Sequence, residues 1–232
     1  MPIADNIARV RERIDAAAHR AGRDPTSIAL MAVGKTVSVA RIGEAYAAGI
    51  RLFGENRVQE FQAKAEGFRD FKDAQVHMIG HLQSNKAARA AELFRGIDSV
   101  DSLHLLQKLD AAASALGKHL PVLIEINIGG ETAKSGLEPE SGELLRVLDA
   151  AQALTSIEVR GLMTVPPFHN DPEKSRPYFR AMRKLHDGIA SQDSSLMQVL
   201  SMGMSDDFEV AIEEGSTCVR IGTAIFGERN RP

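Results

Sequence analysis

Short apolar runs alternate with longer amphipathic stretches along this chain. Residues 5–21 repeat their apolar side chains every three to four positions, which predicts an amphipathic helix that ends at Gly22. Residues 28–33 are consecutive apolar residues, and this run is too short for a typical helix. Such a run is typical of a parallel strand that is covered on both faces.

The alternation of strand and helix continues toward the C-terminus. Ser38 is suited to cap a helix over 38–48, and a strand over 50–53 follows it. A helix that opens at Ser205 is predicted over 205–215, between the last two strands. The remaining predicted strands cover 76–79, 97–100, 121–127, 157–163, 197–200 and 217–221, and the remaining helices cover 85–95, 102–116, 139–153 and 173–190.

About eight strands, each followed by a helical segment, predict an α/β protein with right-handed parallel crossovers. A (β/α)8 TIM barrel fits this count, and its usual size is about 250 residues. Because the chain has 232 residues, we expect a single domain over 1–232. A doubly wound open sheet shows the same alternation and is the structural alternative.

The charge balance and the cysteine count narrow the classes of partner. Lys+Arg 28 against Asp+Glu 31 give a net charge of −3 without a long run of one sign, which indicates neither nucleic acid nor a membrane surface. No apolar run approaches the ~18 residues of a membrane span. Cys218 is the one cysteine, expected to be buried and unreactive, and no signal region opens the sequence. We therefore expect a cytoplasmic protein with a small-molecule partner.

Lys35 is the most informative single residue. In a barrel of this kind the functional face lies where strands end, and Lys35 comes directly after the first apolar run. Apolar surroundings lower the pKa of a lysine, whose neutral amine can then attack a carbonyl and form a Schiff base. The simpler interpretation is a lysine that emerges into solvent. A phosphate-binding P-loop is excluded, since that motif needs a glycine where Ala29 stands.

A second candidate cluster follows the last two predicted strands. In such barrels the loops after strands seven and eight commonly bind phosphate through backbone N–H groups. Gly203 and Gly222 allow the backbone to approach an anion, and the hydroxyls of Ser201 and Thr223 add hydrogen bonds. The alternative is that these glycines only turn the chain.

Strands one and eight are neighbours in a closed barrel, which brings Lys35 next to Arg220 and the two glycine loops. A carbonyl-reactive lysine, a phosphate site and a fixed cation are what pyridoxal 5′-phosphate (PLP) requires. We expect its aldehyde at Lys35, its phosphate at 201–203 and 222–223, and its ring nitrogen facing Arg220. An arginine there keeps that nitrogen unprotonated, which is compatible with carriage or racemisation and argues against more demanding carbanion chemistry.

Several long and unusual blocks resemble the YggS/PROSC family, the pyridoxal phosphate homeostasis proteins, over nearly the whole chain. These blocks are AVGKT (32–36), FGEN (53–56), HMIGHLQSNK (77–86), KSG (134–136), RGLM (160–163), LSMGMSDD (200–207) and VRIGTAIFG (219–227). One departure is that the C-terminal Asn230-Arg231-Pro232 lacks an aromatic residue that the family often has there.

The resemblance implies a barrel of the alanine racemase N-terminal type (PLP fold type III) with PLP on Lys35. It also implies a cytoplasmic monomer that regulates vitamin B6 pools and amino- and keto-acid balance without established turnover. Apo forms of PLP-dependent enzymes are the expected acceptors of the cofactor. The family's phosphate contacts correspond to Ser201, Gly203, Gly222 and Thr223, its ring-nitrogen arginine to Arg220 and a pocket-lining position to Asn56, and we expect Met202 to pack around the cofactor.

Two other functions use the same lysine. A PLP-dependent racemase needs a second acid or base opposite the lysine, and alanine racemases take theirs, a tyrosine, from a further domain and a dimer partner. Tyr46 and Tyr178 both fall on predicted helices and offer no evident substitute. An aldolase acting on a phosphosugar would instead hold its substrate on Lys35.

The remaining polar residues are given simpler interpretations. His77 and His81 have a metal-ligand spacing, but Gly80 turns them apart, so no metal site is expected. Lys134 is expected in solvent, and the resemblance adds the alternative that it lies at the pocket mouth and helps PLP to enter or leave. On the predicted strand 121–127, one of Glu125 and Asn127 is expected to point into the barrel.

Overall fold

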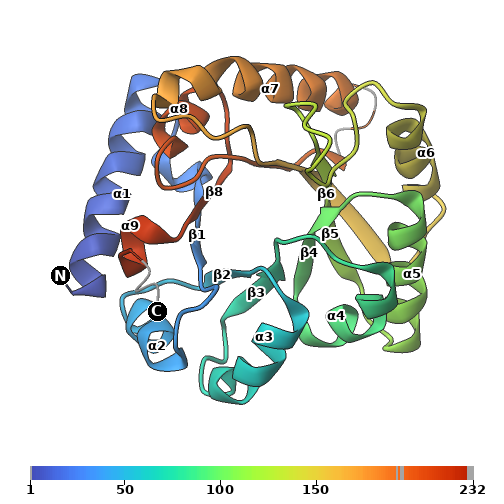
Figure 1. The fold of residues 1–232 in the computed structure, drawn as a ribbon, viewed down its shortest axis with the longest axis horizontal. Helices are drawn as coiled ribbons and strands as arrows, with labels where there is room; N and C mark the ends of the chain where they lie inside the picture. The colour runs from blue at the N-terminus through green and yellow to red at the C-terminus, as the bar shows by residue number, and fades with distance from the viewer. Residues whose placement is uncertain (1, 192, 194–195, 229–232) are drawn as a thin grey trace.

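Eight parallel strands form a closed barrel in sequence order in the computed structural model, with β8 next to β1 (Figure 1). The structure describes residues 2–191, 193 and 196–228. The predicted (β/α)8 class is therefore confirmed, and the open-sheet alternative is wrong. The strands are β1 Ala29–Val33, β2 Leu52–Glu55, β3 Gln75–Met78, β4 Gly96–Val100, β5 Leu120–Ile126, β6 Ile157–Thr164, β7 Val199–Ser201 and β8 Cys218–Ile221.

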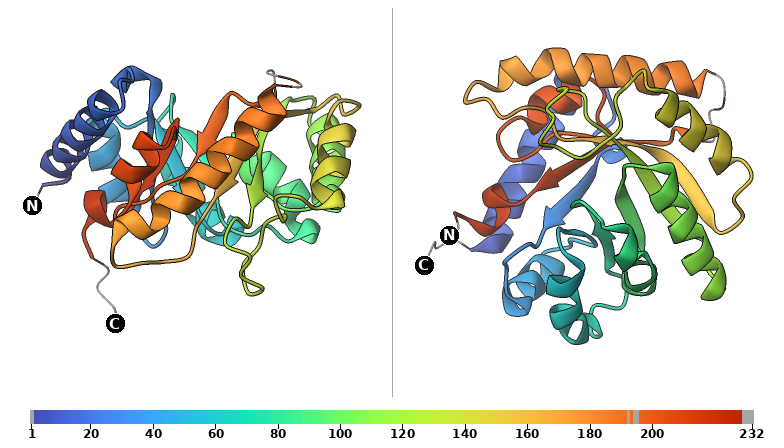
Figure 2. Two further views of the ribbon diagram at one scale, coloured as in Figure 1. Left: turned by 90° about the horizontal axis from the view of Figure 1, so that it is seen from above. Right: turned by 45° about the vertical axis from the view of Figure 1, so that its right-hand side comes forward.

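An outer ring of helices covers the barrel (Figure 1). The first and last of the described helices pack against each other on one side of the barrel (Figure 2). None of the helices in the described ranges has both the length and the apolar character that crossing a lipid bilayer requires. The helices are α1 Ile3–Arg20, α2 Val39–Ala47, α3 Val58–Lys64, α4 Ala87–Leu93, α5 Leu103–Ala115, α6 Gly142–Ala151, α7 Arg176–Ala190, α8 Phe208–Glu213 and α9 Thr223–Phe226, with short 3-10 turns at Pro25–Ser27, Ala65–Phe68, Ser84–Lys86 and Pro172–Ser175.

Helix α3 and the start of α8 differ from the prediction. Helix α3 lies between β2 and β3, where no helix was predicted, and it buries Val58 and Phe61. The predicted helix start at Ser205 is wrong, because α8 begins at Phe208. The Ser205 hydroxyl instead accepts a hydrogen bond from the Ala224 N–H at 3.3 Å. Ser205 therefore joins two loops of the barrel mouth rather than capping a helix.

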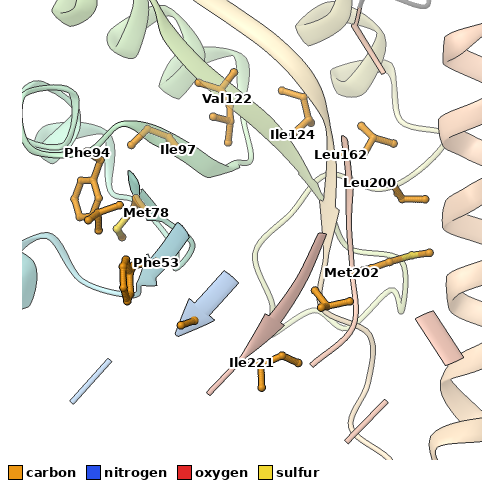
Figure 3. Close-up of a cluster of buried hydrophobic side chains, with 14 of the residues drawn as sticks. Phe53, Met78, Phe94, Ile97, Val122, Ile124, Leu162, Leu200, Met202 and Ile221 are labelled. Atoms are coloured by element: carbon orange, nitrogen blue, oxygen red, sulfur yellow. The ribbon is translucent and has the colours of Figure 1, made fainter. Parts of the chain in front are cut away.

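The barrel wall separates an apolar outer face from a polar inner face. Apolar residues of β1 to β8 pack outward against the helices in one buried cluster (Figure 3). Because strand residues alternate between faces, Arg220, between the outer residues Val219 and Ile221, points inward. The same alternation turns inward several other buried or half-buried polar residues, namely His77, Asp98, Glu125 and Ser201.

Candidate functional site

Lys35 lies in a tight turn at the carboxyl end of β1. The Val37 N–H donates to the Gly34 carbonyl oxygen at 3.0 Å, so Lys35 and Thr36 occupy the centre of a β-turn. Lys35 is half-buried. Side chains at every second position of a strand point to the same face, so Lys35 follows Met31 in direction. Met31 lies on the inner face, because its neighbour Ala32 belongs to the outer cluster.

The pairing of β1 with β8 brings this turn to the last two loops. Met31 pairs with Arg220, and Ala32 pairs with Ile221. A Cβ built on Gly222 would lie 3.6 Å from the Val33 Cβ, so Gly222 sits directly beside the end of β1. The predicted neighbourhood of the Lys35 turn and the β8 loop is confirmed.

Arg220 is a buried cation at the centre of the inner face. It is 3% exposed. Its Nη1 donates to Ser201 Oγ at 2.7 Å, and its Nη2 donates to the Thr164 carbonyl oxygen at 2.8 Å. Burial lowers the pKa of the Arg220 guanidinium, while nearby carboxylates such as Asp98 oppose this change. The guanidinium stays charged at neutral pH because its ordinary pKa lies far above that range.

The loops after β7 and β8 are tied together by the backbone. The Arg220 N–H donates to the Gly203 carbonyl oxygen at 3.0 Å, next to the contact between Ala224 and Ser205. Within the described residues, the N–H groups of Gly203 and Thr223 make no hydrogen bond. These two donors therefore remain for an anion at the barrel mouth.

The two predicted glycines differ in what the protein requires of them. Gly203 has φ +94°, and a Cβ there would lie 2.5 Å from the Ala211 Cβ and 2.9 Å from the Phe208 Cα. Gly222 has φ −109°, and a Cβ there would make only ordinary contacts with Val33. The fold thus demands a glycine at 203 but not at 222.

Ser201, Met202 and Asn56 lie in different surroundings. Ser201 is fully buried, with its hydroxyl against Arg220. Met202 is fully buried too, and its side chain belongs to the outer apolar cluster (Figure 3). Asn56 is half-buried directly after β2 and borders two hollows of the mouth.

The larger of these hollows is a cavity of about 590 Å³. Glu125 reaches it from β5 and accepts hydrogen bonds from the Ser135 hydroxyl at 3.1 and 3.2 Å. Burial raises the pKa of Glu125, which the Ser135 contact partly offsets. Asn127 instead binds the backbone of Glu131 and shapes its own loop. The lining residues are Asn56, Ile79, Gly80, His81, Asp101, Glu125, Ile126, Thr132, Ala133, Lys134, Ser135 and Val165.

Lys134 lies at the wall of this cavity rather than far out in solvent. Its Nζ is paired with the Glu131 carboxylate and donates to the Pro166 carbonyl oxygen at 3.1 Å. The alternative in which this lysine approaches the mouth therefore agrees with its location.

The two histidines point to different partners, as expected from the turn at Gly80. His77 Nδ1 lies 2.9 Å from Asp98 Oδ1 on the inner face, and His81 Nδ1 lies 3.0 Å from Asp101 Oδ2 at the cavity. Burial lowers the pKa of His77, but Asp98 raises it by more, so that the net pKa lies above the ordinary value.

Cys218 is buried on β8, and burial raises the pKa of its thiol to about 12. A thiol with so high a pKa carries almost no thiolate at neutral pH. The prediction of an unreactive cysteine therefore agrees with its surroundings.

Comparison with known proteins identifies the family. The alanine racemase N-terminal domain family matches residues 5–230. The chain is 44% identical over 229 residues to the pyridoxal phosphate homeostasis protein of Aquifex aeolicus (strain VF5), which covers 99% of both chains. This chain belongs to the pyridoxal phosphate homeostasis family. The family member of Escherichia coli (strain K12) is 42% identical and covers 98% of this chain and 97% of its own.

Solved structures of the family share this barrel. PipY of Synechococcus elongatus PCC7942, with PLP bound, has a TM-score of 0.85 and 36% identity, covering 97% of this chain and 100% of that chain. The form of PipY without PLP has a TM-score of 0.86 and 37% identity over the same shares of the two chains. An alanine racemase of Clostridium difficile 630 matches at a TM-score of 0.75 and 13% identity, covering 99% of this chain and 57% of that chain, a likeness of fold alone.

Proposed function

We propose that this family member binds PLP at the carboxyl end of its barrel, holds the aldehyde on Lys35 as a Schiff base and serves PLP homeostasis. The observation that carries the proposal is the pairing of β1 with β8, which joins the turn of Lys35 to the loops of Gly203 and Gly222. The PLP-bound structure of PipY supports it from within the family.

The residues at this end of the barrel fit PLP in space and in charge. Gly222 has no neighbour that requires a glycine, so the missing side chain leaves room for a ligand against the backbone. The N–H groups of Gly203 and Thr223, which have no acceptor in the part of the chain that the structure describes, are suited to an anion such as a phosphate. Arg220 adds a fixed positive charge close to both loops.

Each residue then has a defined role. Bound PLP supplies an aldehyde that condenses with amines and a ring that withdraws electrons. Lys35 would offer the amine, and Arg220, held by Ser201 and Thr164, would face the ring nitrogen as a cation that cannot accept a proton from it. Ser201, Gly203, Gly222 and Thr223 would bind the phosphate and Asn56 would border the cofactor, whereas the side chain of Met202 packs in the outer apolar cluster.

We propose carriage of PLP, and with it control of amino- and keto-acid balance, rather than turnover. The Tyr46 hydroxyl binds Asp73 outside the barrel, and the ring of Tyr178 stacks on His169, so neither tyrosine serves as the second acid or base of a racemase. In this proposal the chain acts in the cytoplasm as a monomer and passes PLP to apo forms of PLP-dependent enzymes.

An absorbance titration tests the proposal. Added PLP is expected to give a saturable visible band that borohydride removes, and Lys35→Ala is expected to lose this band because it lacks the amine that forms the Schiff base. Lys108, an exposed lysine of α5, provides the control variant Lys108→Ala. A protein without saturable PLP binding would contradict PLP binding, and exchange of the α-proton of L-alanine in deuterated buffer at enzyme-like rates would contradict carriage.

A further inference from the structure

Three charged side chains form a compact cluster on the outside of the barrel, behind the turn of Lys35. Lys64, at the end of α3, is 13% exposed in its side chain, and Glu55 on β2 is 1% exposed. The Lys64 Nζ lies 3.1 Å from Glu55 Oε1 and 2.9 Å from Glu60 Oε1. Two carboxylates around one ammonium, largely removed from water, make this cluster more than a solvated surface pair.

The cluster forms hydrogen bonds with the peptide groups on either side of Lys35. The Lys64 Nζ donates to the Gly34 carbonyl oxygen at 2.9 Å, which precedes Lys35 in the chain. The Thr36 N–H, which follows Lys35, donates to Glu60 Oε1. An ammonium has three protons, and Lys64 has three acceptor groups around it, so its donor capacity is fully used.

The turn itself needs such support. Thr36 has φ +63°, a left-handed conformation that is unfavourable for a β-branched residue. Residues in such conformations persist when their surroundings hold them, and the Glu60 contact fixes the N–H of this very residue. The fit behind the turn is close as well, since a Cβ on Gly34 would lie 2.8 Å from Glu55 Oε1.

We propose that Lys64 and Glu60 are positioning residues for Lys35. By holding the peptide groups before and after it, they fix the direction in which the Lys35 side chain leaves β1 for the inner face of the mouth. The inference rests on the proposed function in taking Lys35 as the lysine that carries PLP. In this proposal, α3 lies outside the barrel and still affects the reactivity of Lys35, whose side chain leaves β1 for the inner face.

A matched pair of variants separates the hydrogen bond from the charge. Glu60→Gln keeps an acceptor oxygen for the Thr36 N–H, whereas Glu60→Ala removes it. The double variant Lys64→Met with Glu55→Gln removes the hydrogen bond from Lys64 to the Gly34 carbonyl oxygen, and it does so without leaving the Glu55 carboxylate buried and unpaired. Lys108→Met, on the exposed face of α5, is the control for loss of a lysine.

Two readouts are taken on variants whose circular dichroism and melting show that they are folded. The first is the rate at which PLP becomes borohydride-fixed to Lys35, followed by peptide mass spectrometry. The second is the rate at which trace acetic anhydride acetylates Lys35 in the protein without PLP. We expect Glu60→Ala and the double variant to slow PLP fixation about tenfold or more and to change acetylation by about threefold or more. Glu60→Gln and Lys108→Met should stay near the wild type.

Wild-type rates in both readouts for folded Glu60→Ala and the double variant would overturn the proposal. Equal losses in Glu60→Gln and Glu60→Ala would overturn the assigned contact with Thr36. If the wild type takes up no PLP, the proposed function fails. The acetylation rates of Lys35 in the wild type and the variants then still test whether Lys64 and Glu60 position Lys35. If the double variant does not fold, the Glu60 pair decides alone.

Discussion

The two sides of the barrel mouth are built by different means. On the β1 side, the turn of Lys35 is held from outside by Lys64 and two carboxylates. On the β7–β8 side, the loops are held by a glycine that packs against α8 and by one buried guanidinium. The lysine side should therefore respond to charge and pH, whereas the β7–β8 side, the proposed phosphate side, should respond to added or deleted atoms.

Deleting the guanidinium tests the phosphate side most severely. Arg220→Met removes a buried positive charge that interacts with Asp98 and Glu125, and it removes a donor from the Thr164 carbonyl oxygen. We expect the free energy of unfolding to fall by about 3–5 kcal/mol in urea denaturation, as for a broken buried charge network. Arg146→Met, at a side chain 67% exposed, should cost at most about 1 kcal/mol. Equal losses at the two sites would contradict this account.

Adding one methyl group at Gly203 should be nearly as severe. An alanine there combines a positive φ with a Cβ 2.5 Å from the Ala211 Cβ, and neither atom can move far inside the packing of α8. We expect Gly203→Ala to lose about 2–4 kcal/mol of unfolding free energy, measured in the same denaturation experiment. A loss below about 1 kcal/mol would show that the loop relaxes and that the glycine is not required.

The lysine side should show its dependence on pH through Glu55. Burial raises the pKa of Glu55 from 4.5 to about 7, so the folded protein binds a proton more tightly than the unfolded chain between these values. The stability from this group is thus present at low pH and is lost as the pH rises toward 7. As the pH rises from 4.5 to 7, the free energy of unfolding of Glu55→Gln should increase relative to that of the wild type, by up to about 3 kcal/mol.

Denaturation of both proteins at a series of pH values measures this difference. Glu60 does not mask the effect: burial raises its pKa, but Lys64 and the Thr36 N–H lower it by more, to a net value below the ordinary 4.5. Its contribution is therefore lost only at more acidic pH. A stability difference that stays constant from pH 4.5 to 7 would contradict the buried, proton-binding state of Glu55.

The smallest effect on stability is expected at Gly222. Gly222→Ala adds a Cβ that meets only Val33 at ordinary distances, so the free energy of unfolding should change by less than about 1 kcal/mol. Affinity for PLP should nevertheless fall by about tenfold or more, because the methyl group enters the space assigned to the phosphate. Thermal melting and absorbance titration measure the two quantities. Unchanged affinity would remove Gly222 from the proposed phosphate site.

The barrel could be predicted from the sequence because its strands are covered on both faces. The outward positions of each strand are apolar because the helices cover them, so every strand leaves a short apolar signal such as 28–33 between two amphipathic helices. The neighbourhood of Lys35 and the β8 loop then followed from strand order alone. Helix α3 escaped prediction because only two of its residues, Val58 and Phe61, are buried, so the segment shows little of the apolar spacing that marks an amphipathic helix. Without it, the cluster behind Lys35 could not be predicted either.

Side-chain contacts between residues far apart in the chain could not be predicted from the sequence pattern. Glu60 and Thr36 are 24 residues apart, and Ser205 and Ala224 are 19 apart, so no local spacing indicates either contact. The Ser205 hydroxyl has the chemistry of a helix cap, and only the approach of the β8 loop decides that it binds Ala224 instead. Gly203 and Gly222 likewise look equivalent in sequence, although their backbone angles and neighbours differ.

We propose that the Lys35 turn and the two glycine loops form one PLP site. The most direct test of this proposal is to mix the protein with one equivalent of PLP, reduce with borohydride and map the pyridoxyl group by peptide mass spectrometry. We expect nearly one group per chain on the peptide that contains Lys35, and much less when Gly222→Ala is treated in parallel. Labelling spread over exposed lysines such as Lys108, with Lys35 unmodified, would contradict it.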